Sequence, residues 1–188
     1  MESLKCLEQT VNTLVNKIKT LELDKDTTKI EKLLDTLGET DLYFDEVPKS
    51  YFSNPRIMSK LVEKWPKLLE HATPEIKDDY DIVLKAVGMR GSVLQFASDR
   101  LKSNNTIACT AATSITGFEF ASYQVRSDPN VVKYAINCYG HNFAYASEEL
   151  RGNLEIVKLA VEKHKGAYFM ASKEMQNHPE VLKLVGLE

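Results

Sequence analysis

The chain is short of the residues on which several specialised classes of protein depend. Its 188 residues include three cysteines, Cys6, Cys109 and Cys138, and none of them forms a C-x-x-C pair. This argues against a disulfide scaffold and against a cysteine zinc site. A reducing compartment fits such cysteine usage, and we expect a cytoplasmic protein.

The chain also lacks an excess of positive charge and a long apolar run. Lys and Arg number 24 against 27 Asp and Glu, so the net charge of -3 provides no overall basic field for nucleic acid or acidic lipid. No apolar run approaches ~20 residues, and Lys5, Glu8, Asn12 and Lys17 interrupt the first apolar positions. We therefore expect no nucleic-acid partner, no membrane span and no secretory signal.

What the sequence does contain is a repeat with a period of about 25 residues. Ala-Ser dipeptides begin at Ala97, Ala121, Ala146 and Ala171, and Ala72-Thr73 stands in the same register. A second column is β-branched in every unit: Ile57, Ile82, Ile107, Val131, Ile156 and Val181. With its apolar neighbours this column gives the spacing i, i+1, i+4, i+5, which predicts a helix with a wide buried face at the start of each unit.

Capping residues mark where these first helices begin and end. Proline occupies the first helical position after Asn54, Asp128 and His178, and Asp79, Asn104 and Asn153 occupy the matching cap position in the other units. Of these six residues, only His178 is a poor cap. We expect the first helices to end near Gly91, Gly140 and Gly166, through glycine in the left-handed conformation.

A second helix is predicted in each unit from the spacing i, i+3, i+4, i+7, as in Leu94, Ala97, Ser98 and Leu101. The small Ala column lets two helix axes approach closely. The hydroxyl beside it is expected to return a hydrogen bond to a carbonyl one turn back.

Because each helix pair leaves one face uncovered, neighbouring units must stack. The sequence therefore predicts an all-α fold: a short α-solenoid of helix-turn-helix repeats with an N-terminal helical hairpin. The repeats occupy residues 48–188, as units 54–78, 79–103, 104–127, 128–152, 153–177 and a partial unit 178–188. The unit 104–127 is one residue short, and we place the deletion at its inter-helix turn, between Ala111 and Ala121.

Residues 1–47 do not share the repeat and form the predicted hairpin and connector. Their first helix has a heptad seam: Leu4, Leu7, Val11, Leu14, Ile18 and Leu21. Thr28 and Glu31 can form a capping box for the second helix. The seam either caps the first repeat, where Tyr51 and Phe52 are expected in a partial helix, or pairs with another chain in a homodimer.

The repeated residue pattern resembles that of an uncharacterised family of helical repeats, catalogued only as a domain of unknown function. Residues 128–132 (Asp-Pro-Asn-Val-Val) and 146–151 (Ala-Ser-Glu-Glu-Leu-Arg) carry the resemblance most closely. The units at Asn54 and Asn104 depart from the pattern at their turns. The resemblance implies repeats of the kind found in protists, large viruses and effectors of amoeba-infecting bacteria, and it carries over no catalytic residue.

Two columns are candidate binding residues. One is basic and lies at the end of each second helix: Lys77, Lys102, Arg126 and Arg151, replaced by Gln176 in the last unit. The helix dipole favours a cation there, but stacked side chains would also form a stripe for an acidic peptide or phosphate. The other is mainly aromatic, with Phe96, Phe120 and Tyr145 in line with His71 and Met170. It either packs between second helices or faces a partner.

No residue pattern predicts catalysis, a metal or a cofactor. Histidines 71, 141, 164 and 178 never come as a pair at i, i+3 or i+4, so the usual helical zinc constellation is missing. The leading hypothesis is a non-enzymatic protein-protein interaction module, in its specific form a secreted effector or effector regulator that acts in a host cytosol. The alternative is an enzyme or enzyme subunit with a cryptic thiol site near Cys138 and His141.

Overall fold

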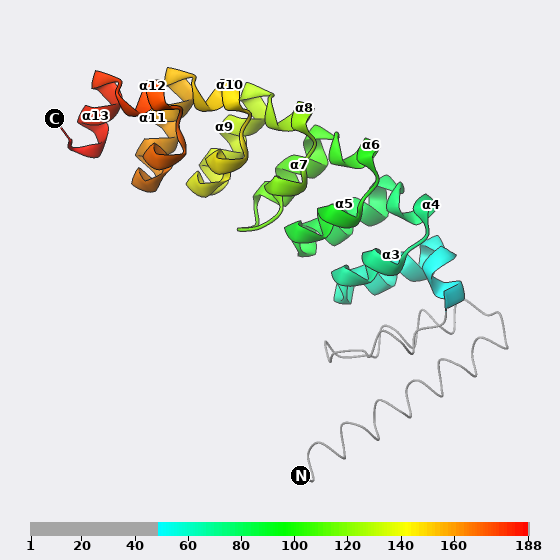
Figure 1. Cartoon of the computed structure of the whole chain (residues 1–188). Coiled ribbons are helices and arrows are strands. Elements are labelled where there is room, and N and C mark those ends of the chain that lie inside the picture. The colour runs from blue at the N-terminus through cyan, green and yellow to red at the C-terminus, as the bar shows by residue number, and fades with distance from the viewer. Residues whose placement is uncertain (1–48, 188) are drawn as a thin grey trace, which may run out of the picture. The chain divides into compact units, whose positions relative to one another are not determined.

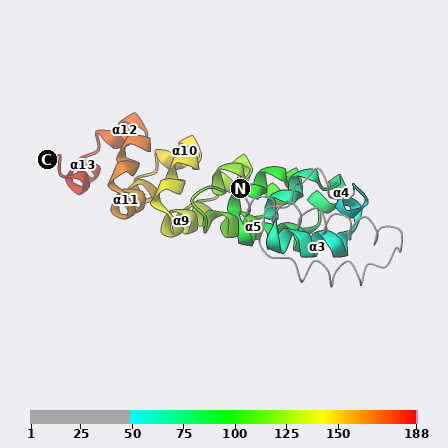
Figure 2. The same cartoon turned by 90° about the horizontal axis from the view of Figure 1, so that it is seen from below.

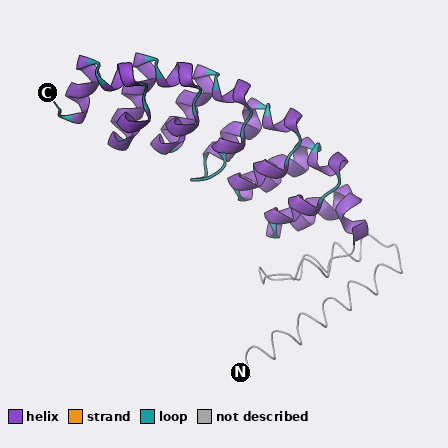
Figure 3. Cartoon of the chain, viewed as in Figure 1, coloured by secondary structure: helices purple, strands orange, loops and turns teal. Residues whose placement is uncertain are grey.

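The computed structural model describes residues 49–187, and these residues form an all-α solenoid of helical repeats (Figure 1). No strand occurs among them (Figure 3). The predicted hairpin and the seam from Leu4 to Leu21 lie outside the described residues. The chain divides within helix α5 into two compact units, Met1–Lys85 and Ala86–Glu188.

The described part of the first unit contains the first repeat and the start of the second. Its elements are η2 (Lys49–Ser53), α3 (Pro55–Lys64), η3 (Pro66–His71), α4 (Pro74–Lys77) and the first residues of α5 (Tyr80–Met89). Tyr51 and Phe52 are buried in η2, and the amide of Thr73 donates to the Phe52 carbonyl at 3.0 Å. This confirms the predicted partial helix at the first repeat.

The second unit continues the same pattern to the end of the described chain. After α5 come η4 (Gly91–Phe96), α6 (Asp99–Lys102), α7 (Asn105–Ala112), η5 (Phe118–Phe120), α8 (Tyr123–Arg126), α9 (Pro129–Cys138), η6 (Gly140–Tyr145), α10 (Glu148–Arg151), α11 (Leu154–Lys163), η7 (Lys165–Met170), α12 (Lys173–Gln176) and α13 (Pro179–Val185). Helix α9 packs against α7 and against α11, and α11 packs against α13. Figure 2 shows α9, α11 and α13 following one another. The β-branched column of the first helices is buried in every unit. No helix between residues 49 and 187 has the length and apolar character needed to cross a bilayer.

The predicted caps hold the start of each first helix. The side-chain oxygens of Asn54, Asp79, Asn104, Asp128 and Asn153 each accept hydrogen bonds from backbone amides in the first turn. His178 makes no such bond, as expected from its chemistry. The capping residues therefore fix the register of the repeats, because each one satisfies amides that the helix leaves without an internal partner.

The prediction of one continuous second helix is wrong. Each of these segments breaks into a 3-10 helix and a short α-helix, separated by an extended alanine such as Ala97, at φ -69° and ψ 161°. The serine that follows is an N-cap: the Ser98 hydroxyl accepts from the Leu101 amide at 3.3 Å, where we expected it to donate to a carbonyl one turn back. The spacing i, i+3, i+4, i+7 arises here from two short helices in succession.

The extended Ala-Ser link also joins neighbouring repeats through the backbone. The amides of Ser122, Ser147 and Ser172 donate to the carbonyls of Lys102, Arg126 and Arg151 at 2.9, 2.8 and 2.9 Å. Each of these bonds reaches from one repeat to the last short helix of the preceding repeat. A continuous helix would have used these amides internally, so the break is what frees them for inter-repeat contact.

The expected left-handed glycines at the ends of the first helices are also absent. Among the described glycines, only Gly186 has a φ in that region, at 80°. Gly91 is required for a different reason, because a Cβ there would come within 2.6 Å of the Ala111 carbonyl oxygen. The turn glycine thus permits two backbones to approach closely.

Candidate interaction surface

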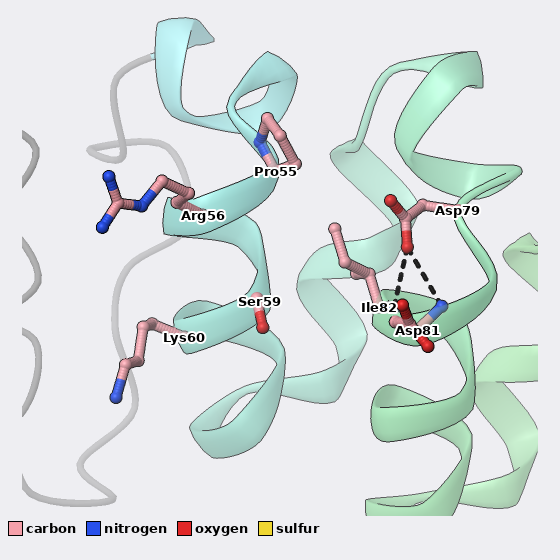
Figure 4. A pocket seen from close by; sticks show the side chains of 7 residues that line it. All are labelled: Pro55, Arg56, Ser59, Lys60, Asp79, Asp81 and Ile82. Atoms are coloured by element: carbon pink, nitrogen blue, oxygen red, sulfur yellow. Dashed lines mark hydrogen bonds between the residues drawn. The ribbon is translucent and has the colours of Figure 1, made fainter.

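An open hollow of about 450 Å³ lies beside α3 and the start of α5, in the first unit (Figure 4). In the figure, Arg56 and Lys60 extend away from Asp79 and Asp81. Asp79 is committed to capping α5, with its oxygen 3.0 Å from the amides of Asp81 and Ile82. A catalytic site requires functional groups that converge on one point, and the charged groups of this hollow do not converge.

The basic column lies where the sequence placed it, at the C-terminal ends of the short α-helices, and its side chains are half-buried. Arg126 reaches into the junction between repeats. Its Nε donates to the Ala121 carbonyl and its Nη1 to the Tyr145 carbonyl, both at 3.0 Å. Arg151 donates from Nη1 to the Met170 carbonyl at 3.4 Å. The two arginines therefore tie one repeat to the next through charge-assisted hydrogen bonds.

The other members of the basic column make different contacts. Gln176 donates from Nε2 to the Ala171 carbonyl at 3.0 Å, so an uncharged side chain makes a bond equivalent to that of Arg126 Nε. Lys102 lies 4.0 Å from the exposed carboxylate of Asp99, a separation at the limit of an ion pair. Arg126 and Arg151 thus each bond to a carbonyl of the next repeat, whereas Gln176 bonds to carbonyls of its own repeat. Recognition of an acidic peptide by Lys77, Lys102, Arg126 and Arg151 stays a prediction.

The aromatic column is half-buried at Phe96, Phe120 and Tyr145. Burial, together with the nearby Glu119 carboxylate, raises the pKa of the Tyr145 hydroxyl. His71 is the exposed member, and its ring centre lies 5.7 Å from that of Phe52. Half-burial is compatible both with packing between second helices and with contact to a partner.

Cys138 and His141 have different neighbours. Cys138 is half-buried at the end of α9, one turn beyond Tyr134, and it raises the pKa of the Tyr134 hydroxyl. Burial, and after it the neighbouring Cys138, raises the pKa of the Cys109 thiol, which keeps Cys109 a protonated and poorly nucleophilic group. His141 is exposed and lies against a second imidazole, that of His164.

The sequence did not indicate that several apolar side chains are exposed. Ile115 is 71% exposed in the turn after α7, and Tyr134 and Tyr139 are 47% and 41% exposed on and directly after α9. Tyr123 and Phe169 are also exposed. Phe169 occupies a column whose other members are Glu70, Gln95, Glu119 and Ala144. A large apolar residue in an otherwise polar or small column was the signal that could have identified it.

The chain matches a known protein family. A family model described as "Domain of unknown function (DUF4116)" matches residues 54–102 and again residues 128–176, together about half of the chain. Each match begins at a capping residue and spans two successive repeats, and the shortened unit lies between them. No curated protein and no solved structure matches the chain.

Proposed function

Because the chain belongs to the family described as "Domain of unknown function (DUF4116)", a family of helical repeats, we propose that it is a protein-protein interaction module without catalytic activity of its own. Helical repeats offer an extended surface on which binding is distributed over several units. Within residues 49–187, the one hollow described above has charged groups that point apart. This arrangement supports binding more than chemistry.

The observation that carries the proposal is the exposure of Ile115, Tyr134 and Tyr139 on two successive repeats. Ile115 and Tyr139 each stand eleven residues after the capping residue of their unit, so they occupy the same end of neighbouring repeats. Tyrosine and other large side chains are enriched at the centres of protein interfaces, where they supply contact area at a small cost in conformational entropy. We define Ile115, Tyr134 and Tyr139 as the apolar face and propose that it contacts the partner protein.

The specific form of the proposal is an effector or effector regulator that binds a protein in the cytoplasm or, after delivery, in a host cytosol. Its support is the resemblance of the repeats to those of effectors from amoeba-infecting bacteria. The effector proposal can be tested at the apolar face, because the same residues would contact the target protein.

Site-specific photocrosslinking tests the apolar face. A benzophenone amino acid is placed at Tyr134 or Tyr139 and, as a control, at Glu148, which is exposed on α10. We expect both tyrosine positions to crosslink to the same protein in cell lysate and the control position to give none of this product. The double variant Tyr134→Ala/Tyr139→Ala should reduce recovery of that protein at least about tenfold. Equal products from all three positions would contradict the proposal.

A thiol-dependent activity near Cys138 and His141 is the competing function. Cys138 lies beside Tyr134 and Cys109, whereas His141 lies against His164. The variant Cys138→Ala distinguishes the two functions. Loss of an activity with the captured partner unchanged would favour the enzyme, whereas an unchanged partner and no activity to lose would favour the interaction module.

A further inference from the structure

Two of the four histidines lie close together although they belong to different repeats. His141 is in η6, and His164 is the residue between α11 and η7. Their ring centres are 5.8 Å apart, and both side chains are exposed. Helix η6 packs against both α11 and η7, so the pair is formed where one repeat meets the next.

The separation of the two rings suits a shared metal ion. An imidazole nitrogen binds a divalent transition metal at about 2.0–2.1 Å, which puts the ion about 3.2 Å from the ring centre. Two rings on one ion then have centres about 4.5 Å apart at a bond angle of about 90°, and about 6.4 Å apart when they are opposite each other. The observed 5.8 Å lies within this interval.

Two glycines hold the backbone of this junction in close contact. A Cβ at Gly140 would lie 2.7 Å from the Cβ of His164, so the start of η6 approaches α11 more closely than any other residue would allow. A Cβ at Gly166 would lie 2.6 Å from the Nε2 of His164. Gly166 therefore makes room for the His164 imidazole, whose Nε2 lies beside this glycine.

The chemistry of the pair selects the class of ion. Imidazole nitrogen is a ligand for Zn²⁺, Ni²⁺ and Cu²⁺, whereas Mg²⁺ and Ca²⁺ require carboxylate or carbonyl oxygens. Lys163 and Lys165 flank His164. Their positive charge repels cations, so a cation that is bound only by electrostatic attraction is disfavoured here. No group of three or more His, Cys, Asp and Glu side chains among residues 49–187 is arranged to hold a metal.

We propose that His141 and His164 form a two-histidine site for a divalent transition-metal cation, with water or a ligand from a bound partner completing its coordination. The site joins two successive repeats, because each repeat contributes one imidazole. Bound metal would therefore stabilise the junction between these repeats by mass action.

Titration of the purified full-length protein with NiCl₂ tests the site. We expect saturable binding that is reversed by EDTA and is weakened at least about tenfold by either His141→Ala or His164→Ala, since even loss of an outer partner of a metal ligand commonly costs tenfold or more. The matched controls are His71→Ala, an exposed histidine of the first repeat, which should leave binding unchanged, and MgCl₂, which should not bind. Undiminished Ni²⁺ binding in both single variants would overturn the proposal, because the ion would then be held elsewhere.

A second measurement needs no variant and so does not depend on how the variants fold. In side-chain imidazole NMR spectra of the full-length protein, substoichiometric Ni²⁺ should broaden the signals of His141 and His164 before those of His71 and His178. Equal broadening of all four imidazoles, or none, would show that the pair is not a metal site.

Discussion

At the scale of single residues, Asn142 is the clearest case of a side chain whose role depends on its surroundings. It is 1% exposed, and its Nδ2 donates to the carbonyls of Ala112 at 3.2 Å and Ala135 at 2.9 Å. The same column holds Leu68, Val93 and Ala167 in other repeats. Helix α7 ends at Ala112, and Asn142 satisfies the carbonyl of this last residue.

Replacing Asn142 with valine, the residue of the equivalent position at Val93, should destabilise the protein by about 1–3 kcal/mol, because it leaves a buried carbonyl without its donor. Chemical denaturation monitored by circular dichroism measures the change. The matched control is Asn137→Ala, since the exposed Asn137 makes a single bond to the Lys133 carbonyl, and we expect a change within about 0.5 kcal/mol. Equal costs for the two variants would contradict the role assigned to Asn142.

Arg126 and Lys102 occupy the same column but differ in their contacts. Arg126→Met keeps most of the apolar stem while removing one hydrogen bond within its repeat and one to the next repeat, so we expect a loss of about 1–3 kcal/mol in unfolding free energy. Lys102→Met should cost less than about 0.5 kcal/mol, because the Asp99 carboxylate near Lys102 is exposed and 4.0 Å away. The comparison is made by urea denaturation. A larger loss for Lys102→Met would show that the lysine, and not the arginine, joins the repeats.

At the scale of elements, the repeat consists of one α-helix of about ten residues, a 3-10 helix and a one-turn α-helix, as in α9, η6 and α10. The alanine between the last two is nearly fully buried in every unit. Because alanine is small, the extended chain segment can lie close to its neighbours. The amide of the serine that follows then donates a hydrogen bond to the preceding repeat. Short helices of this kind depend on such tertiary contacts, because a single turn is unstable alone.

The variant Ala146→Leu should therefore destabilise the protein by about 1–3 kcal/mol through overpacking. Ala144→Leu is the matched control: Ala144 is two residues away, half-buried, and in the column that carries the exposed Phe169. We expect the control to retain the melting temperature of the parent protein. If thermal melts show the Ala146 variant to be as stable as the parent, the repeat register described above is wrong.

At the scale of the whole molecule, each repeat is stabilised by its neighbours and not by one central core. Within Ala86–Glu188 the helices α7, α9, α11 and α13 pack in succession, and the exposed ion pair Lys158–Glu180, at 2.7 Å, lies between the last two. Stability in such an array is close to a sum of repeat and interface contributions. The ends of the array are consequently the places where a further covering element has the largest effect.

Deleting residues 1–23 tests how the predicted seam covers its apolar side. If the seam pairs two chains, the full-length protein should have the mass of a dimer in light scattering and the truncated protein that of a monomer, with helical circular dichroism retained. If the seam instead caps the first repeat, both proteins are monomeric and the truncated one melts at a lower temperature. A full-length protein that is monomeric at high micromolar concentration would exclude the dimer.

The sequence by itself determined the repeat register, the start of every first helix and the all-α class. These features depend on local chemistry: a capping side chain acts within one turn, and an apolar column needs only helical periodicity. The six first-helix starts follow directly from the cap positions, including the weak cap at His178. The family match begins at two of these same residues.

The tertiary structure decided what local pattern leaves undetermined. The break at Ala146-Ser147 has the same spacing as a continuous helix, and the bond from the Ser147 amide to the Arg126 carbonyl of the preceding repeat favours the extended link. The role of Arg126 follows from a carbonyl nineteen residues away, and the pair of His141 and His164 from the close approach of two turns. Each of these features joins residues from different repeats, and a periodic pattern cannot indicate which atoms meet when the repeats stack.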